Sequence, residues 1–174
     1  MTAPINQLHI SLIPAQDRLL LRVGTATERE LRFWMTRRFV KALWPVLLEA
    51  LQADPTVAGQ ADPRVRREVL SFQHQQAVQD TEFTKEYKAS PQTRPLTQTP
   101  LLLTGARCEV VNATLIRLQL ITARNKMFGL TLDRKTVHSI CKLIADCAEK
   151  AGWGLDLPLA EPVGSGRKSA RTIN

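Results

Sequence analysis

Long apolar runs are missing from the 174-residue sequence, since none reaches the roughly 18 residues of a membrane span. The segment Met1 to Ile5 has no basic region followed by an apolar stretch, which argues against a secretory signal. We therefore expect a cytoplasmic protein with no membrane partner. The apolar fraction of 44% and the charged fraction of 23% are typical of globular chains, which excludes extensive disorder.

Cysteine is scarce as well, with three residues and none at the spacing of a zinc finger. An odd number of cysteines fits a reducing compartment, where thiols behave as small apolar groups. His138 and Cys141 lie three positions apart and could both reach one metal ion. However, Cys141 falls on the expected apolar stripe of a helix, and His138 falls on its solvated flank. We therefore predict no metal site and no cofactor.

Sequence motifs of catalysis are absent too. The chain has no phosphate-binding loop, no nucleophile elbow, no zinc-protease motif and no dinucleotide fingerprint. Acid pairs such as Glu28 with Glu30 lie in expected turns, where carboxylates are solvated or pair with neighbouring bases. We predict a protein that has no catalytic residues and is not an enzyme.

What the sequence does contain is an internal repeat at an offset of 97 residues. The offset holds across a period-2 pattern, typical of strands, and a period-3.6 pattern, typical of a helix. The alternative is that two unrelated amphipathic units resemble each other by chance. The aligned pairs include Leu19 with Ile116, Leu21 with Leu118, Val23 with Leu120, Leu31 with Phe128, Thr36 with Asp133 and Leu43 with Ile140.

Each half of the repeat predicts three strands followed by a helix. Thr36 and Asp133 directly precede the two helices, where their side chains can accept a hydrogen bond from a helix N–H group. The fold class that we expect is α+β, a tandem pseudo-repeat of βββα units whose antiparallel sheet has its helices packed on one face. The predicted strands are 8–13, 18–25, 31–35, 101–111, 115–123 and 128–132, and the predicted helices are 37–53, 64–78 and 134–151.

The predicted elements divide the chain into four parts. These are a first βββα repeat at 1–53, a helical insertion with a proline-containing linker at 54–99, a second repeat at 100–154 and a flexible basic tail at 155–174. We expect residues 1–154 to form one compact body. The broad apolar stripe of the first helix and the open edges of the sheet predict a two-fold homodimer.

Basic residues outnumber acidic residues by 24 to 16, and the net charge of +8 favours anionic partners. Strand alternation turns several cations and one ring to the sheet face opposite the helices, with one lysine at a neighbouring turn. In a single-strand binder, cations contact phosphates and a ring stacks on a base. We therefore expect a non-catalytic protein that binds single-stranded nucleic acid. The candidate binding residues are Arg22, Arg32, Trp34, Arg107, Arg117 and Lys126.

The same face also carries Leu20 and Ile121, which interrupt the charge and suit an interface with another protein. The alternative function is a protein–protein interaction or scaffold module that uses this face without nucleic acid. The expected architecture resembles that of Pur-type and whirly single-strand binders, whose repeats also place one helix behind an antiparallel sheet. The resemblance is in topology alone, since each half predicts three strands where those families have four.

Overall fold

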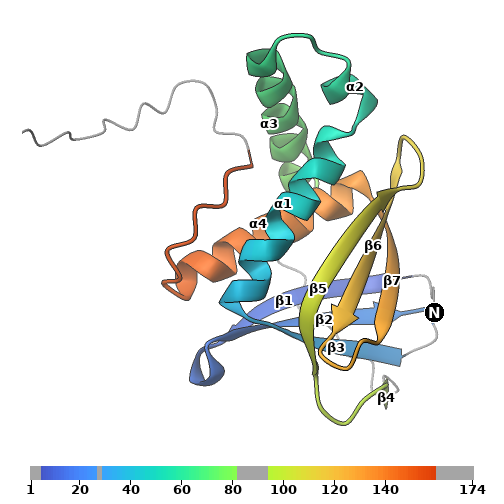
Figure 1. The fold of residues 1–174 in the computed structure, drawn as a ribbon, viewed down its shortest axis with the longest axis vertical. Coiled ribbons are helices and arrows are strands. Elements are labelled where there is room, and N and C mark those ends of the chain that lie inside the picture. Colours follow the sequence, from blue (N-terminus) through green and yellow to red (C-terminus); the bar gives the residue numbers. More distant parts are fainter. Residues whose placement is uncertain (1–4, 27–28, 82–93, 160–174) are drawn as a thin grey trace, which may run out of the picture.

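A computed structural model describes residues 5–26, 29–81 and 94–159 of the chain (Figure 1). Residues 82–93 of the predicted linker and residues 160–174 of the predicted tail lie outside it. The described part is α+β, as predicted, with four helices and a mixed sheet. Its elements are β1 (Ile5–Ile13), β2 (Arg18–Thr25), β3 (Arg29–Met35), α1 (Arg37–Gln52), α2 (Pro55–Ala58), α3 (Pro63–Gln79), β4 (Arg94–Pro95), β5 (Leu101–Val110), β6 (Leu115–Thr122), β7 (Met127–Asp133) and α4 (Arg134–Lys150).

The six longer strands form one sheet in the order β1-β2-β3-β5-β6-β7. Neighbouring strands are antiparallel except β3 and β5, which run parallel and pair through Phe33 with Leu101 and Trp34 with Leu102. The prediction of an antiparallel sheet is therefore wrong at this junction. The chain re-enters the sheet at β4, which pairs in parallel with the start of β3 through Arg29 and Arg94, and β5 continues in the same direction beside the end of β3.

Alternating strand residues build one side of the core. Both β2 and β6 alternate half-buried and buried positions along their whole length, as the period-2 pattern predicts. On the buried side, the rings of Phe33 and Phe128 meet edge to face with their centroids 5.3 Å apart. Helix α1 packs against β5 and α4 packs against β1, so each helix contacts a strand from the other half of the chain (Figure 1).

The two long helices α1 and α4 begin at the predicted caps. The Thr36 side chain accepts a hydrogen bond from the N–H of Phe39, and the Asp133 side chain accepts one from the N–H of Thr136. Each cap satisfies an N–H group that the first helical turn leaves unpaired. Helix α1 continues through Pro45 and ends one residue before the predicted boundary. The single turn α2 was not predicted.

Part of the apolar surface of α1 is covered by the chain that follows α4. The indole N–H of Trp44 donates to the backbone carbonyl of Pro158 at 3.1 Å. The indole N–H of Trp153 donates to Asp17 Oδ1 at 2.6 Å, which ties the same segment to the turn between β1 and β2. Both tryptophans are buried. The broad apolar stripe of α1 is therefore partly covered by the chain itself. Only the open edges of the sheet remain as a reason to expect a homodimer.

Candidate nucleic-acid interface

The first group of candidate residues lies on β2 and β3, on the sheet face opposite the buried positions. Arg22 and Arg32 are direct cross-strand neighbours, as are Leu20 and Trp34. Two like charges in such positions repel each other unless a counter-charge lies close by. Glu30 supplies that charge, because it shares the outer face of β3 with Arg32. The prediction that Glu30 lies in a turn is wrong, because Glu30 belongs to β3. The alternation of positions 30, 32 and 34 places it on this face.

Glu30 binds both guanidinium groups. One carboxylate oxygen accepts hydrogen bonds from Arg22 Nε at 3.2 Å and Nη2 at 2.8 Å, and the other oxygen lies 3.8 Å from Arg32 Nε. Arg32 Nη2 also donates to the backbone carbonyls of Thr97 and Gln98, both at 2.9 Å. The Glu30 side chain is 5% exposed, so water screens this cluster only weakly. Several N–H donors of Arg22 and Arg32 are therefore already bound within the molecule.

The second group of candidates, on β5, β6 and the following turn, is more open. Arg107 and Lys126 are exposed, and within the described ranges neither side chain makes a hydrogen bond or ion pair. Arg117 Nη1 lies 3.3 Å from Glu109 Oε2, in a pair whose side chains are 41% and 61% exposed. Such exposed pairs contribute at most about 1 kcal/mol, so a phosphate can replace the carboxylate as the partner of Arg117.

Trp34 lies in the middle of an apolar row that crosses three strands. Leu20 of β2 is its cross-strand neighbour on one side, and Leu102 of β5 is its neighbour on the other. All three side chains are half-buried. A partly open indole beside two leucines can stack on a base or pack against an apolar side chain of a protein. The surroundings of Trp34 therefore suit both functions considered from the sequence.

The cluster of Arg22, Glu30 and Arg32 has no equivalent in the other half of the outer face. The residues 97 positions after Arg22, Glu30 and Arg32 are Gln119, Met127 and Gly129. The β5–β7 half thus has no counterpart of the buried carboxylate, and Met127 is 65% exposed in its place. The cations predicted to form one continuous surface fall into two groups: Arg22 and Arg32, which share the Glu30 carboxylate, and the more open Arg107, Arg117 and Lys126.

His138 and Cys141 have different surroundings. Cys141 is buried in the core as predicted, and burial raises the pKa of its thiol. His138 is only 4% exposed, so its assignment to a solvated flank is wrong. It lies under α3, where its Nδ1 is 3.3 Å from Nδ1 of His74, and nothing in the local pattern of α4 indicates this cover. No three His, Cys, Asp or Glu side chains of the described residues are grouped to hold a metal.

Comparison with known proteins finds no family model, no curated protein and no solved structure that matches this chain. In the ranges that the structure describes, no helix is long and apolar enough to cross a membrane.

Proposed function

We propose that the protein binds single-stranded nucleic acid, without catalysis, on the outer face of its sheet. The observation that carries the proposal is the open cationic surface of the β5–β7 half, where Arg107, Arg117 and Lys126 reach solvent. These cations would neutralise phosphates, while Trp34 on neighbouring β3 offers a ring to a base. Arg22 and Arg32 contribute less, because Glu30 and backbone carbonyls hold their donors.

Fluorescence anisotropy with labelled single-stranded DNA and RNA tests this proposal. The double variant Arg107→Ala, Lys126→Ala should bind more weakly and show a shallower decline of log affinity with log salt. The slope should change by about 1.4, because each phosphate contact on a single strand contributes about 0.7. The matched control is Arg37→Ala with Arg38→Ala, which removes the same charge from exposed positions on α1. Equal losses in both variants would contradict the assigned face.

A protein–protein interaction module on the same face is the second candidate, and the apolar row of Leu20, Trp34 and Leu102 favours it. An interface centred on this row gains affinity from buried apolar area and depends little on salt. Trp34→Ala would then remove binding of the protein partner, while Arg107→Ala with Lys126→Ala would leave it. Absence of nucleic-acid binding even at low salt would favour this second function.

We further infer that the fold is a tandem pseudo-repeat of two βββα units, with α1 and α4 on one face of the sheet. Two strand pairings support the inference, since Leu19 pairs with Met35 and Ile116 pairs with Leu132, at an offset of 97. The two helix caps are related by the same offset. An experimental structure in which residues 18–51 do not superpose on residues 115–148 would contradict the repeat.

A further inference from the structure

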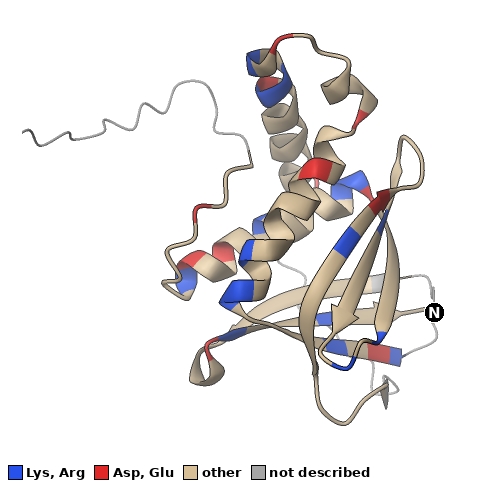
Figure 2. Cartoon of the chain, in the orientation of Figure 1, with Lys and Arg blue, Asp and Glu red and all other residues tan. Residues whose placement is uncertain are grey.

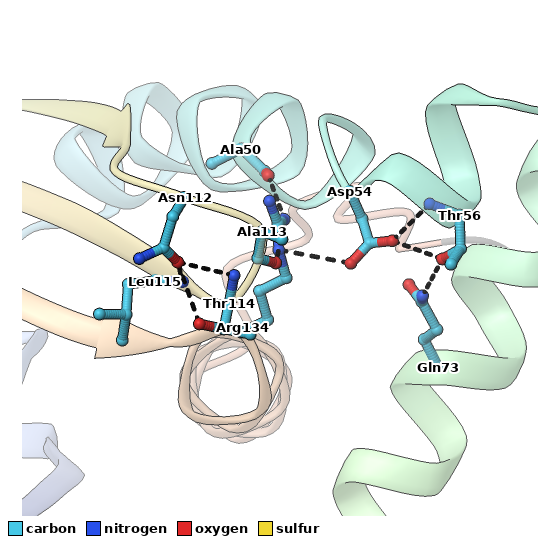
Figure 3. Close-up of polar contacts among 9 residues, drawn as sticks. All are labelled: Ala50, Asp54, Thr56, Gln73, Asn112, Ala113, Thr114, Leu115 and Arg134. Atoms are coloured by element: carbon cyan, nitrogen blue, oxygen red, sulfur yellow. Dashed lines mark hydrogen bonds and ion pairs between the residues drawn. The ribbon is translucent and has the colours of Figure 1, made fainter.

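Arg134, the first residue of α4, binds oxygen atoms from two distant segments of the chain. Arg134 Nη1 donates to the carbonyl oxygen of Ala50 at 2.8 Å, and Nε donates to the carbonyl oxygen of Ala113 at 2.7 Å (Figure 3). Nε also lies 3.3 Å from Asp54 Oδ2, and the two side chains are 11% and 14% exposed. Ala50 lies in the last turn of α1 and Asp54 lies just beyond it. Arg134 therefore binds the C-terminal end of a helix together with the carboxylate that follows.

Asp54 is held in position for this contact. Its Oδ1 accepts hydrogen bonds from the backbone N–H of Thr56 at 2.8 Å and from the Thr56 hydroxyl (Figure 3). That hydroxyl oxygen in turn accepts from Gln73 Nε2 at 2.8 Å. Burial alone would raise the pKa of Asp54, but the Thr56 hydrogen bonds and the charge of Arg134 lower it. Asp54 is therefore ionised at neutral pH.

The next residue of α4 shares only the ion pair of this arrangement, and the two side chains of that pair are 49% and 60% exposed. Lys135 Nζ lies 3.6 Å from Asp80 Oδ2. Asp80 is the C-cap of α3, so Lys135 also pairs with a carboxylate placed directly after a helix. The carbonyl groups at a helix C-terminus carry partial negative charge, and a carboxylate there adds a full one. The first two cations of α4 thus each pair with a carboxylate at the C-terminal end of a helix, and Arg134 also binds a helix carbonyl.

The start of α1 carries the same type of residues without such partners. Arg37, Arg38 and Lys41 stand 97 positions before Arg134, Lys135 and His138. All three are exposed, and none makes a side-chain hydrogen bond or ion pair with the residues described in the structure. The first turn of α1 contains no acidic residue, and Figure 2 shows its N-terminal end in blue. These cations are unfavourably placed relative to the helix dipole and to one another.

We propose that the basic α1 patch of Arg37, Arg38 and Lys41 binds the C-terminal end of a helix in a protein partner, with Asp or Glu directly after its last turn. Such an end offers carbonyl and carboxylate oxygens together, which are the acceptors that Arg134 takes from the end of α1. Lys135 takes a carboxylate oxygen alone. Its negative charge also complements the three cations and the N-terminal dipole of α1.

The chemistry of the patch favours this partner over a nucleic acid. Single-strand binding uses exposed rings between the cations, because base stacking supplies part of the affinity. The two aromatic residues of α1, Phe39 and Trp44, are both buried. The cations of α1 therefore offer charge and hydrogen bonds without a stacking surface.

Two-dimensional NMR of the full-length, ¹⁵N-labelled protein tests the proposal with a defined probe. The probe is an amidated, alanine-based helical peptide that ends in two aspartates, and its control peptide ends in two asparagines. The aspartate peptide should cause saturable shift changes in the backbone amides of residues 36–42. It should bind about tenfold more tightly than the asparagine peptide, as expected for the loss of one charge-assisted contact.

Arg37→Ala with Arg38→Ala should remove these shift changes without disturbing the rest of the spectrum, since neither side chain has a described partner to lose. The matched variant Arg107→Ala, Lys126→Ala should respond to the peptide like the native protein. Equal affinity for the two peptides, or shifts that persist in the α1 variant, would overturn the proposal. It would also be overturned if a single-stranded oligonucleotide, and not the aspartate peptide, shifted residues 36–42.

Discussion

A buried carboxylate raises the free energy of the folded state unless cations and hydrogen bonds compensate for the lost hydration. Glu30 meets this condition through Arg22 and Arg32, which would otherwise oppose each other across two strands. The same contacts limit how far these two arginines can serve a ligand. The open cations of the outer face are consequently those of β5, β6 and the following turn.

Replacing this carboxylate should destabilise the protein. We expect Glu30→Gln to lower the free energy of unfolding by about 1.5–3 kcal/mol, because the hydrogen bonds from Arg22 and the ion pair with Arg32 are weakened. Glu109→Gln is the matched control, since its pair with Arg117 is exposed and contributes less than about 1 kcal/mol. Chemical denaturation of both variants measures the difference. If Glu30→Gln costs no more than Glu109→Gln, the stabilising role of the cluster is wrong.

The contact between His74 and His138 predicts how stability depends on pH. Burial, His74 and Arg134 lower the pKa of His138 from 6.5 to about 4, and burial also lowers the pKa of His74. Below pH 6.5 the unfolded chain therefore binds more protons than the folded one, so acid favours unfolding. The stability from a neutral His138 is complete above pH 6.5 and is lost progressively down to about pH 4.

The loss attributable to His138 is on the order of 3 kcal/mol across this range. Denaturation curves of the native protein and of His138→Asn, recorded from pH 7.5 to about pH 4, separate this contribution from that of the carboxylates. The variant should lose less stability than the native protein over the same interval. Parallel pH curves for the two proteins would contradict the depressed pKa.

At the scale of secondary-structure elements, α1 and α4 should depend equally on one apolar position each. Leu43 and Ile140 are 3% and 4% exposed and stand 97 positions apart. Leu43→Ala and Ile140→Ala should each lower the free energy of unfolding by about 2–5 kcal/mol, because each leaves a cavity in the core. Leu48→Ala, at a half-buried position of α1, should cost less. Losses below about 1 kcal/mol for both core variants would show that the wrong helix faces are assigned.

The individual elements could be predicted because their signals are local. Alternation of apolar residues in 18–25 and 115–122 predicts β2 and β6, since successive side chains of a strand point to opposite faces. A capping side chain directly before an apolar helical stripe predicts the starts of α1 and α4. The same alternation assigns each strand-borne candidate residue to the outer face of the sheet.

Contacts between elements could not be predicted in this way. Alternation places Glu30 and Arg32 on one face, but it cannot show that the backbone at residues 97 and 98 accepts hydrogen bonds from Arg32. Nothing in α4 indicates that α3 covers His138. The parallel pairing of β3 with β5 brings together residues more than 60 positions apart, such as Phe33 and Leu101. Each feature depends on where a distant segment returns, which local periodicity does not encode.

At the scale of the whole molecule, three surfaces are available to partners. We propose that the outer face of β5–β7 binds nucleic acid and that the basic α1 patch binds an acidic helix end of a protein. The edges of β1 and β7 have no further strand beside them in the described part, and the homodimer expected from the sequence stays a prediction. These surfaces lie on different elements, so ligands on the sheet face and on α1 need not exclude each other.

The measurement that tests the proposed function most directly is the salt dependence of binding to a labelled single-stranded oligonucleotide. It compares the full-length protein with two variants that each lose three cations: Arg107→Ala, Arg117→Ala, Lys126→Ala in the sheet, and Arg167→Ala, Lys168→Ala, Arg171→Ala in the C-terminal segment. The sheet variant should lower the slope of log affinity against log salt by about 2, and the C-terminal variant should retain most of the native slope. The opposite result, with native binding by the sheet variant and none by the C-terminal variant, would contradict a nucleic-acid interface on the sheet.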